Sequence, residues 1–250
     1  METALIVAFV AGGIAAASAL GNIWSSLRNT ERNNQNARRI EALRLEHENR
    51  KNADAKRREV SKYSEPLARA AYDLQSRMFN ILKQNFVKAY LINGNDREKT
   101  YVVENTTFLV SQFLCWTEQI RRDIQFIDLD ESAKSLELFR LQDSIYYLWG
   151  TDLHSPLFRL FAGEQRAIGE ALIQTGPAGS ECIGYGKFLQ SFPAGSNALI
   201  DQVRSDVRAL ATDLRGARDR LTRLQHALVD LLGLLDPHQI RFSSDRRTKI

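Results

Sequence analysis

Apolar side chains along the chain form one uninterrupted run and, after it, several helical stripes. The run is Ala4 to Trp24, ALIVAFVAGGIAAASALGNIW, and it carries no charged side chain. The later stripes repeat every three or four residues, which is the spacing of one helix face. These patterns predict an all-α protein with a single N-terminal transmembrane helix, a long charged stalk helix and a helical bundle.

The apolar run predicts a membrane anchor over residues 1–24. Its 21 residues would span about 32 Å as a helix, close to the ~30 Å of a bilayer core. A cleaved signal peptide is one alternative, because Ala17-Ser18-Ala19 resembles a cleavage site, although no Lys or Arg precedes the run. A buried core helix is the other. Small residues at a spacing of four would let two such spans associate.

Residues 25–62 predict a basic stalk helix without Pro or Gly, and they carry eleven Lys or Arg against six acids. The basic residues nearest the span are Arg28, Arg32, Arg38 and Arg39. Because positive residues stay in the cytoplasm, we expect an inner-membrane protein with its N-terminus outside and its body inside. Anionic lipid is the expected partner of the stalk. Nucleic acid is disfavoured, because acids rather than aromatic residues are interleaved with the basic ones.

Residues 63–236 predict a cytosolic helical bundle. Ser64-Glu65-Pro66 is typical of a helix start, and Asn93-Gly94-Asn95 of a helix end. The apolar positions between Glu131 and Trp149 are too close for one narrow stripe, so that helix should be largely buried. The further helices are expected at 97–127, capped by Asp96, at 158–173, and at 181–191, capped by Ser180.

The last predicted helix has the most regular pattern. Apolar residues from Val203 to Leu235 follow a 4-3-4-3 spacing until Asp236-Pro237. One interpretation is a coiled coil that makes a homo-oligomer. The other, which we favour, is a long bundle helix that packs on residues 65–149 of its own chain. A basic tail, 237–250, follows it.

The motifs of common chemistries are missing from the sequence. The four histidines, at 47, 154, 226 and 238, are not spaced as metal ligands, and no phosphate loop or nucleophile elbow is found. Cys115 and Cys182 lie in apolar surroundings and should be reduced. We therefore predict no catalytic, metal or cofactor site.

One charged stretch, FRLFAGEQRAIGE, is the candidate site. It places Arg159, Glu164, Arg166 and Glu170 among apolar residues. Such charges usually pair with one another and fix how helices meet, but they can also line a pocket for an anionic ligand. Earlier helices place further charges beside aromatic positions, namely Arg69, Asp73, Arg77, Glu118, Arg121 and Arg122.

The segment YSEPLARAAYDLQSRMFNIL, with GEQRAIGE further on, resembles a group of uncharacterised bacterial proteins that share a membrane anchor and a helical body. This resemblance implies no activity and no functional residue. The leading hypothesis is a non-enzymatic scaffold or sensor at the cytosolic face of the membrane. The alternative is a membrane-tethered enzyme or ligand-gated effector with an anion-binding pocket around Arg159–Glu170. An effector that acts on the bilayer through assembled spans ranks last, because the span has no ionisable residue.

Overall fold

The computed structural model describes residues 2–123, 132–176, 179–243 and 247–250. Side chains are described in this part except at 2–23, 27, 30, 53, 55–61, 123 and 132–135. The chain divides into two units, Met1–Arg58 and Glu59–Ile250, and helix α1 (Glu2–Lys83) contributes to both. The structure is mostly helical, as the apolar pattern predicts.

The first unit consists of the N-terminal part of α1. Residues 31–52 are all exposed, including the isolated apolar side chains Ile40, Leu43 and Leu45. The prediction that the charged segment 25–62 is helical is confirmed. The predicted span, Ala4–Trp24, falls on residues whose side chains lie outside the described set, apart from Trp24. Within the described part of the chain, no helix is long and apolar enough to cross a membrane.

The predicted helix start at Ser64-Glu65-Pro66 is wrong, because α1 continues through Pro66 to Lys83. A proline inside a helix costs about 3 kcal/mol. Burial of Tyr63 and Leu67 on either side of Pro66 offsets this cost, since both belong to the buried face of α1 that continues to Leu82.

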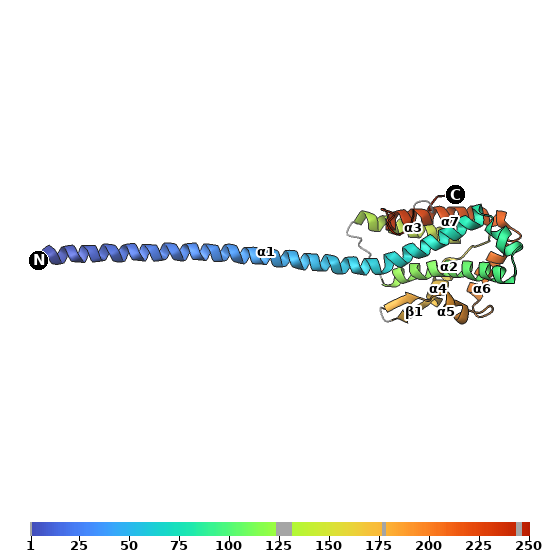
Figure 1. The fold of residues 1–250 in the computed structure, drawn as a ribbon, viewed down its shortest axis with the longest axis horizontal. Coiled ribbons are helices and arrows are strands. Elements are labelled where there is room, and N and C mark those ends of the chain that lie inside the picture. The colour runs from blue at the N-terminus through green and yellow to red at the C-terminus, as the bar shows by residue number, and fades with distance from the viewer. Residues whose placement is uncertain (1, 124–131, 177–178, 244–246) are drawn as a thin grey trace. The chain divides into compact units, whose positions relative to one another are not determined.

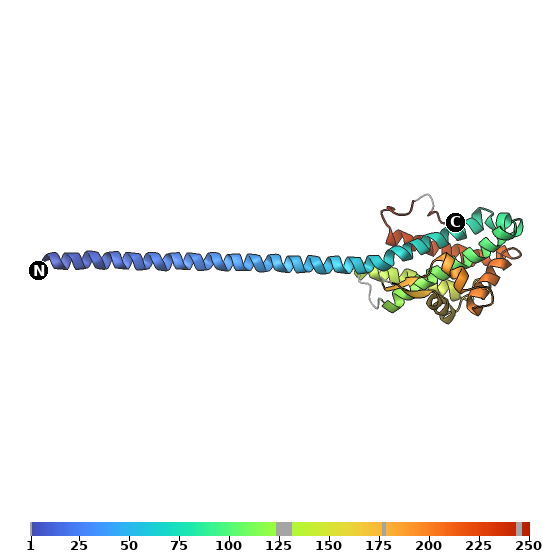
Figure 2. The same ribbon diagram turned by 60° about the horizontal axis from the view of Figure 1, so that its bottom comes forward.

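The body, Glu59–Ile250, packs helices around the last turns of α1 (Figure 1). Hydrogen bonds join α1 to α2 (Arg77 to Asn105) and to α7 (Gln225 to Gln75), and both views place α1 alongside these helices (Figure 2). After α1 the elements are π-helix η1 (Val87–Ile92), α2 (Asp96–Asp123), α3 (Ser132–Gly150), α4 (Ala162–Ala171), β1 (Ile173–Gly176), β2 (Gly179–Cys182), α5 (Tyr185–Ser191), α6 (Ala198–Ala209) and α7 (Leu214–Leu235).

The residue that caps the start of α2 differs from the predicted one. Asn95, not Asp96, is the capping residue: its side-chain oxygen accepts from the Glu98 amide at 3.0 Å. The Glu98 carboxylate accepts from the Asn95 amide at 2.8 Å in return. This reciprocal capping box satisfies two amides that the first helical turn leaves free.

The prediction of one long C-terminal heptad helix is also wrong, because the structure has two helices, α6 and α7, which are separated at Leu210–Asp213. Asp213 caps α7 by accepting from the Gly216 amide. The apolar repeat continues across this break, and Leu210 before it and Ala217 after it are both buried. The apolar positions from Val203 to Leu231 are buried within their own chain, except Leu214 beside the break, which is partly buried, and this agrees with the bundle interpretation.

The expected helix capped by Ser180 is replaced by a β-hairpin. Strands β1 and β2 pair antiparallel from Ile173↔Cys182 to Gly176↔Gly179. Helix α5 begins later, after Gly184. A two-stranded hairpin is marginal by itself. Here the buried Leu172 and Ile183, joined by a backbone hydrogen bond, anchor its base in the core.

The segment 237–250, predicted as a basic tail, packs on the body where it is described. Phe242 is buried and stacks on Tyr72, with ring centroids 4.7 Å apart. Its cations pair with carboxylates of the body: Arg241 with Glu65, Arg247 with Asp236 and Lys249 with Asp230. These charges therefore help to fix the end of the chain.

Candidate ligand pocket between α2, α3 and α4

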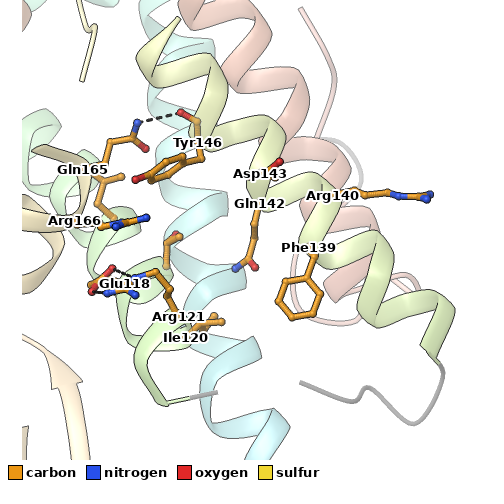
Figure 3. A pocket seen from close by; sticks show the side chains of 12 residues that line it. Glu118, Ile120, Arg121, Phe139, Arg140, Gln142, Asp143, Tyr146, Gln165 and Arg166 are labelled. Carbon is orange, nitrogen blue, oxygen red and sulfur yellow. Dashed lines mark hydrogen bonds and ion pairs between the residues drawn. The ribbon is translucent and has the colours of Figure 1, made fainter. Parts of the chain in front are cut away.

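A pocket of about 400 Å³ lies between α2, α3 and α4 (Figure 3). Its walls are mainly apolar, with charged and amide groups on the side of α2 and α4 and along α3. The lining residues are Leu114, Thr117, Glu118, Ile120 and Arg121 of α2, Phe139, Arg140, Gln142, Asp143 and Tyr146 of α3, and Gln165 and Arg166 of α4.

Helices α4 and α2, which both line the pocket, approach each other closely at Gly169. A Cβ atom at Gly169 would lie 2.6 Å from the Leu114 carbonyl oxygen, closer than real Cβ contacts occur. Glycine is therefore required where the two helices meet. Gln165, 2% exposed, joins α4 to α3 by donating its side-chain amide to the Tyr146 carbonyl at 3.0 Å.

Glu118 brings a buried negative charge to the α2 wall. It is 3% exposed and accepts hydrogen bonds from Arg121 at 2.6 and 2.7 Å and from Arg122 at 2.8 Å. Burial raises the pKa of Glu118, but the hydrogen bonds and charges of the two arginines outweigh burial, so the pKa lies below its usual value. Glu118 is therefore ionised at neutral pH and holds Arg121 at the pocket.

Arg166 provides a cation that a ligand can reach. It is exposed, and its guanidinium lies 5.9 Å from the centre of the Tyr146 ring. Figure 3 shows it extending from α4 toward Glu118 and Arg121. Among the described residues, no carboxylate forms an ion pair with Arg166. One side of the pocket is thus cationic.

Two buried amide atoms of the lining have no hydrogen-bond partner among the described residues: the oxygen Oε1 of Gln165 and the nitrogen Nε2 of Gln142. Figure 3 shows Gln142 between Tyr146 and Phe139. An unsatisfied buried polar atom is costly. The pocket can therefore offer one acceptor and one donor to a ligand, in addition to its cations.

The hydroxyl groups of the lining are engaged in hydrogen bonds to the backbone. The described residues that line the pocket include no histidine, cysteine or serine. Thr117 donates its hydroxyl to the Phe113 carbonyl, and Tyr146 donates to the Ala162 carbonyl. Elsewhere Cys115 and Cys182 are both free, and interaction with Cys115 together with burial raises the pKa of the Cys182 thiol. Within the described residues no His, Cys, Asp or Glu group suits a metal ion.

The four charges singled out in the sequence do not converge on this pocket. Of them only Arg166 lines it. Arg159 pairs with Asp152 at 2.6 Å, Glu164 accepts from the Phe161 amide at the start of α4, and Glu170 pairs with Arg122. Arg159 and Glu164 therefore serve the local structure, and Glu170 joins α4 to α2.

The four arginines that the sequence predicts to lie near the membrane belong to the first unit, and none of them is among the residues that line the pocket. Arg28, Arg32, Arg38 and Arg39 are all exposed, and the Arg28 guanidinium lies 3.7 Å from the centre of the Trp24 ring.

The α3 wall of the pocket corrects the prediction of a largely buried helix. Leu138, Ile145 and Trp149 are buried, whereas Leu136, Phe139 and Tyr147 are exposed. The buried set packs toward α7, and Phe139 on another face reaches the pocket. The crowded apolar pattern already indicated a second apolar face on α3, because one buried stripe could not account for all of its apolar residues.

Comparison of the chain with protein-family models, with curated proteins and with solved structures finds no match. The resemblance to membrane-anchored helical proteins therefore stays a prediction.

Proposed function

We propose that the protein is a membrane-anchored, non-enzymatic sensor whose body binds an apolar ligand that carries an anionic group. The observation that supports this proposal most strongly is the pocket between α2, α3 and α4, with apolar walls and the cations Arg121 and Arg166 on one side. A volume of about 400 Å³ is within the range of small-molecule sites. A sensor is preferred to a plain scaffold because a scaffold does not need such a pocket.

Three features support the anchor. The run from Ala4 to Trp24 is long enough for a single span and has no charged residue. Arg28 stacks on Trp24, and in the proposed anchor this amphipathic ring would meet the inner interface. The exposed Arg32, Arg38 and Arg39 follow and would lie near the anionic leaflet. The expected location is the inner membrane, with the N-terminus outside and the body in the cytoplasm.

The ligand proposal is tested by calorimetric titration of the full chain in nanodiscs, with empty nanodiscs as the reference. The probe is naphthalene-2-sulfonate, which joins an apolar ring to an anion, and the neutral comparison is 2-naphthylmethanol. We expect Arg166→Gln to weaken sulfonate binding about tenfold, which is about 1.4 kcal/mol, and to leave binding of the neutral probe nearly unchanged. Gln142→Trp should fill the pocket and weaken both probes.

The matched control is Arg208→Gln, an exposed arginine on α6 that does not line the pocket. It removes the same charge and should leave both affinities as in the wild type. If the sulfonate does not bind, or if the Arg166 and Arg208 variants bind it equally, the ligand proposal is wrong.

The anchor is tested separately by alkaline extraction of membranes from cells that express the full chain. We expect the protein to stay in the membrane pellet, and deletion of residues 2–24 to release it. A C-terminal tag should be protected from protease added to spheroplasts. Extraction of the full chain by alkali, or digestion of the tag, would contradict the anchor or its orientation respectively.

A further inference from the structure

A second cavity, of about 560 Å³, lies where α1 ends and α2 begins. Three aromatic rings line it, those of Phe86, Tyr90 and Tyr101, together with Arg97 and Glu98. Tyr90 and Tyr101 are about half exposed. Large aromatic side chains with open faces at a cavity are suited to stack on a planar ligand.

The backbone around this cavity is irregular, and two residues favour this irregularity, Asn85 and Gly94. Asn85 has φ of 54°, in the left-handed region, and the π-helix η1 begins two residues later, at Val87. At the end of η1, a Cβ atom on Gly94 would lie 2.2 Å from the Tyr90 carbonyl oxygen, so glycine is required. Such π-helical turns are frequent at functional sites. Here the turn brings the rings of Phe86 and Tyr90 together, with centroids 5.3 Å apart.

Behind the rings lies a buried cation, Arg77. It is 8% exposed, and its guanidinium lies 4.4 Å from the centre of the Phe86 ring and 5.5 Å from that of Tyr101. Its nitrogen Nη2 donates to the Asn105 side chain at 2.6 Å, whereas Nη1 is buried without a partner among the described residues. Aromatic faces attract a cation, but they do not neutralise it as a carboxylate would.

At the rim of the cavity, the charges of Arg97 and Glu98 have different roles. The Glu98 carboxylate accepts from the Asn95 amide in the cap of α2, whereas Arg97 is exposed and lines the cavity. The carboxylate of Glu98 also lines the cavity, but Arg97 at the rim and Arg77 behind the rings carry two positive charges against its single negative charge, so the cavity favours an anion.

We propose that this cavity is a second binding site, for a planar aromatic anion of mononucleotide size. The ring of the ligand stacks on Tyr90 and Tyr101, and its anionic group contacts Arg97. The positive charge of Arg77 adds to the attraction from behind Phe86 and Tyr101. The site is independent of the proposed function, because it shares no lining residue with the first pocket.

The test is calorimetric titration of the full chain in nanodiscs with three probes: adenosine 5′-monophosphate, adenosine and inorganic phosphate. We expect the nucleotide to bind at least tenfold more tightly than either part alone. Arg97→Gln should weaken the nucleotide about tenfold and bring it close to adenosine. Tyr90→Ala should weaken both the nucleotide and adenosine, and Tyr90→Phe should restore the affinity because the ring is retained.

The matched control is Arg208→Gln, which removes an exposed arginine that lines neither cavity and should leave nucleotide binding unchanged. Thermal unfolding of each variant checks that the body is intact. The proposal is overturned if the nucleotide does not bind at millimolar concentration, if Arg97→Gln has no effect, or if phosphate binds as tightly as the nucleotide. These results are separable from those with naphthalene-2-sulfonate, so the two sites can fail independently.

Discussion

Charged side chains have different physical roles in the exposed part of α1 and in the body. Between residues 31 and 52 the ion pairs are Arg44–Glu48 and Arg50–Glu46, and all four side chains are more than half exposed. Each pair joins neighbouring turns of one helix. Such pairs are worth about 0.3–0.5 kcal/mol and are weakened by salt. They stabilise the helix locally and do not determine which other element it packs against.

In the body, arginines of the same chemistry are buried and join elements far apart in the sequence. Arg204, 1% exposed, holds Glu104 of α2 with two of its nitrogens at 2.8–3.1 Å. Arg220, 0% exposed, donates to the carbonyl groups of Leu148, Trp149, Thr151 and Ser155 at the end of α3 and in the loop after it. A buried cation therefore fixes where helices meet, because few other positions would satisfy its donors.

The largest effect should come from Arg220→Met, which keeps the length of the side chain and removes its donors. The carbonyl groups of Leu148, Thr151 and Ser155 would lose their arginine donor, at a cost of about 3–5 kcal/mol, whereas the Trp149 carbonyl keeps the hydrogen bond from the Leu160 amide. Urea unfolding measures this cost. Arg223→Met, three residues on and largely exposed, is the control and should cost less than ~0.5 kcal/mol. A loss below ~1 kcal/mol for Arg220→Met would contradict the role assigned to Arg220.

The next effect concerns the approach of α4 to α2. Gly169→Ala places a methyl group against the Leu114 carbonyl, and we expect a loss of about 2–3 kcal/mol from overpacking. Gly163→Ala on the same helix is the control. Its added Cβ meets nothing within 4 Å, so it should be neutral or stabilise α4 by up to ~1 kcal/mol. Equal unfolding free energies for the two variants would show that the close approach is not required.

A smaller effect should appear in the pH dependence of stability. Because the pKa of Glu118 is lowered in the folded state, its contribution is present above the unfolded pKa and is lost as pH falls through the folded pKa. Glu118→Gln should therefore destabilise the body by about 1–2 kcal/mol at pH 7, and the difference from wild type should shrink in acid. Denaturant unfolding between pH 7 and pH 3 tests this. A difference that does not depend on pH would exclude the ionised Glu118 as its source.

The smallest effect should come from the exposed part of α1. Glu46→Gln breaks the pair with Arg50, which is 2.6 Å long, and should cost less than ~0.5 kcal/mol. Unfolding of the body should not change, and far-UV circular dichroism should show only a slight loss of helix that disappears at high salt. A change comparable with that of Glu118→Gln would remove the contrast between the exposed and the buried charges.

The helical class and the buried faces could be predicted from local pattern. The spacing of Leu67, Leu74 and Met78 identifies the face of α1 that is buried, and the leucines up to Leu231 identify that of α7. Such predictions succeed because periodicity depends only on residues within a few turns of one another. The same reasoning wrongly predicted a helix start at Pro66, and it wrongly predicted one continuous helix across Leu210–Asp213. Both errors arose where burial by distant segments competed with a local signal.

The two proposed binding sites depend on distances between side chains of different helices, and local sequence patterns do not give these distances. Arg159, Glu164, Arg166 and Glu170 lie within twelve residues, yet their partners are Asp152, the Phe161 amide, the Tyr146 ring and Arg122. Which carboxylate meets which arginine is decided by how helices cross, and a single glycine, Gly169, sets one of these crossings. Local periodicity thus determined which faces are buried. The packing of those faces decided which charges pair, which amides stay without partners and where a cavity stays open.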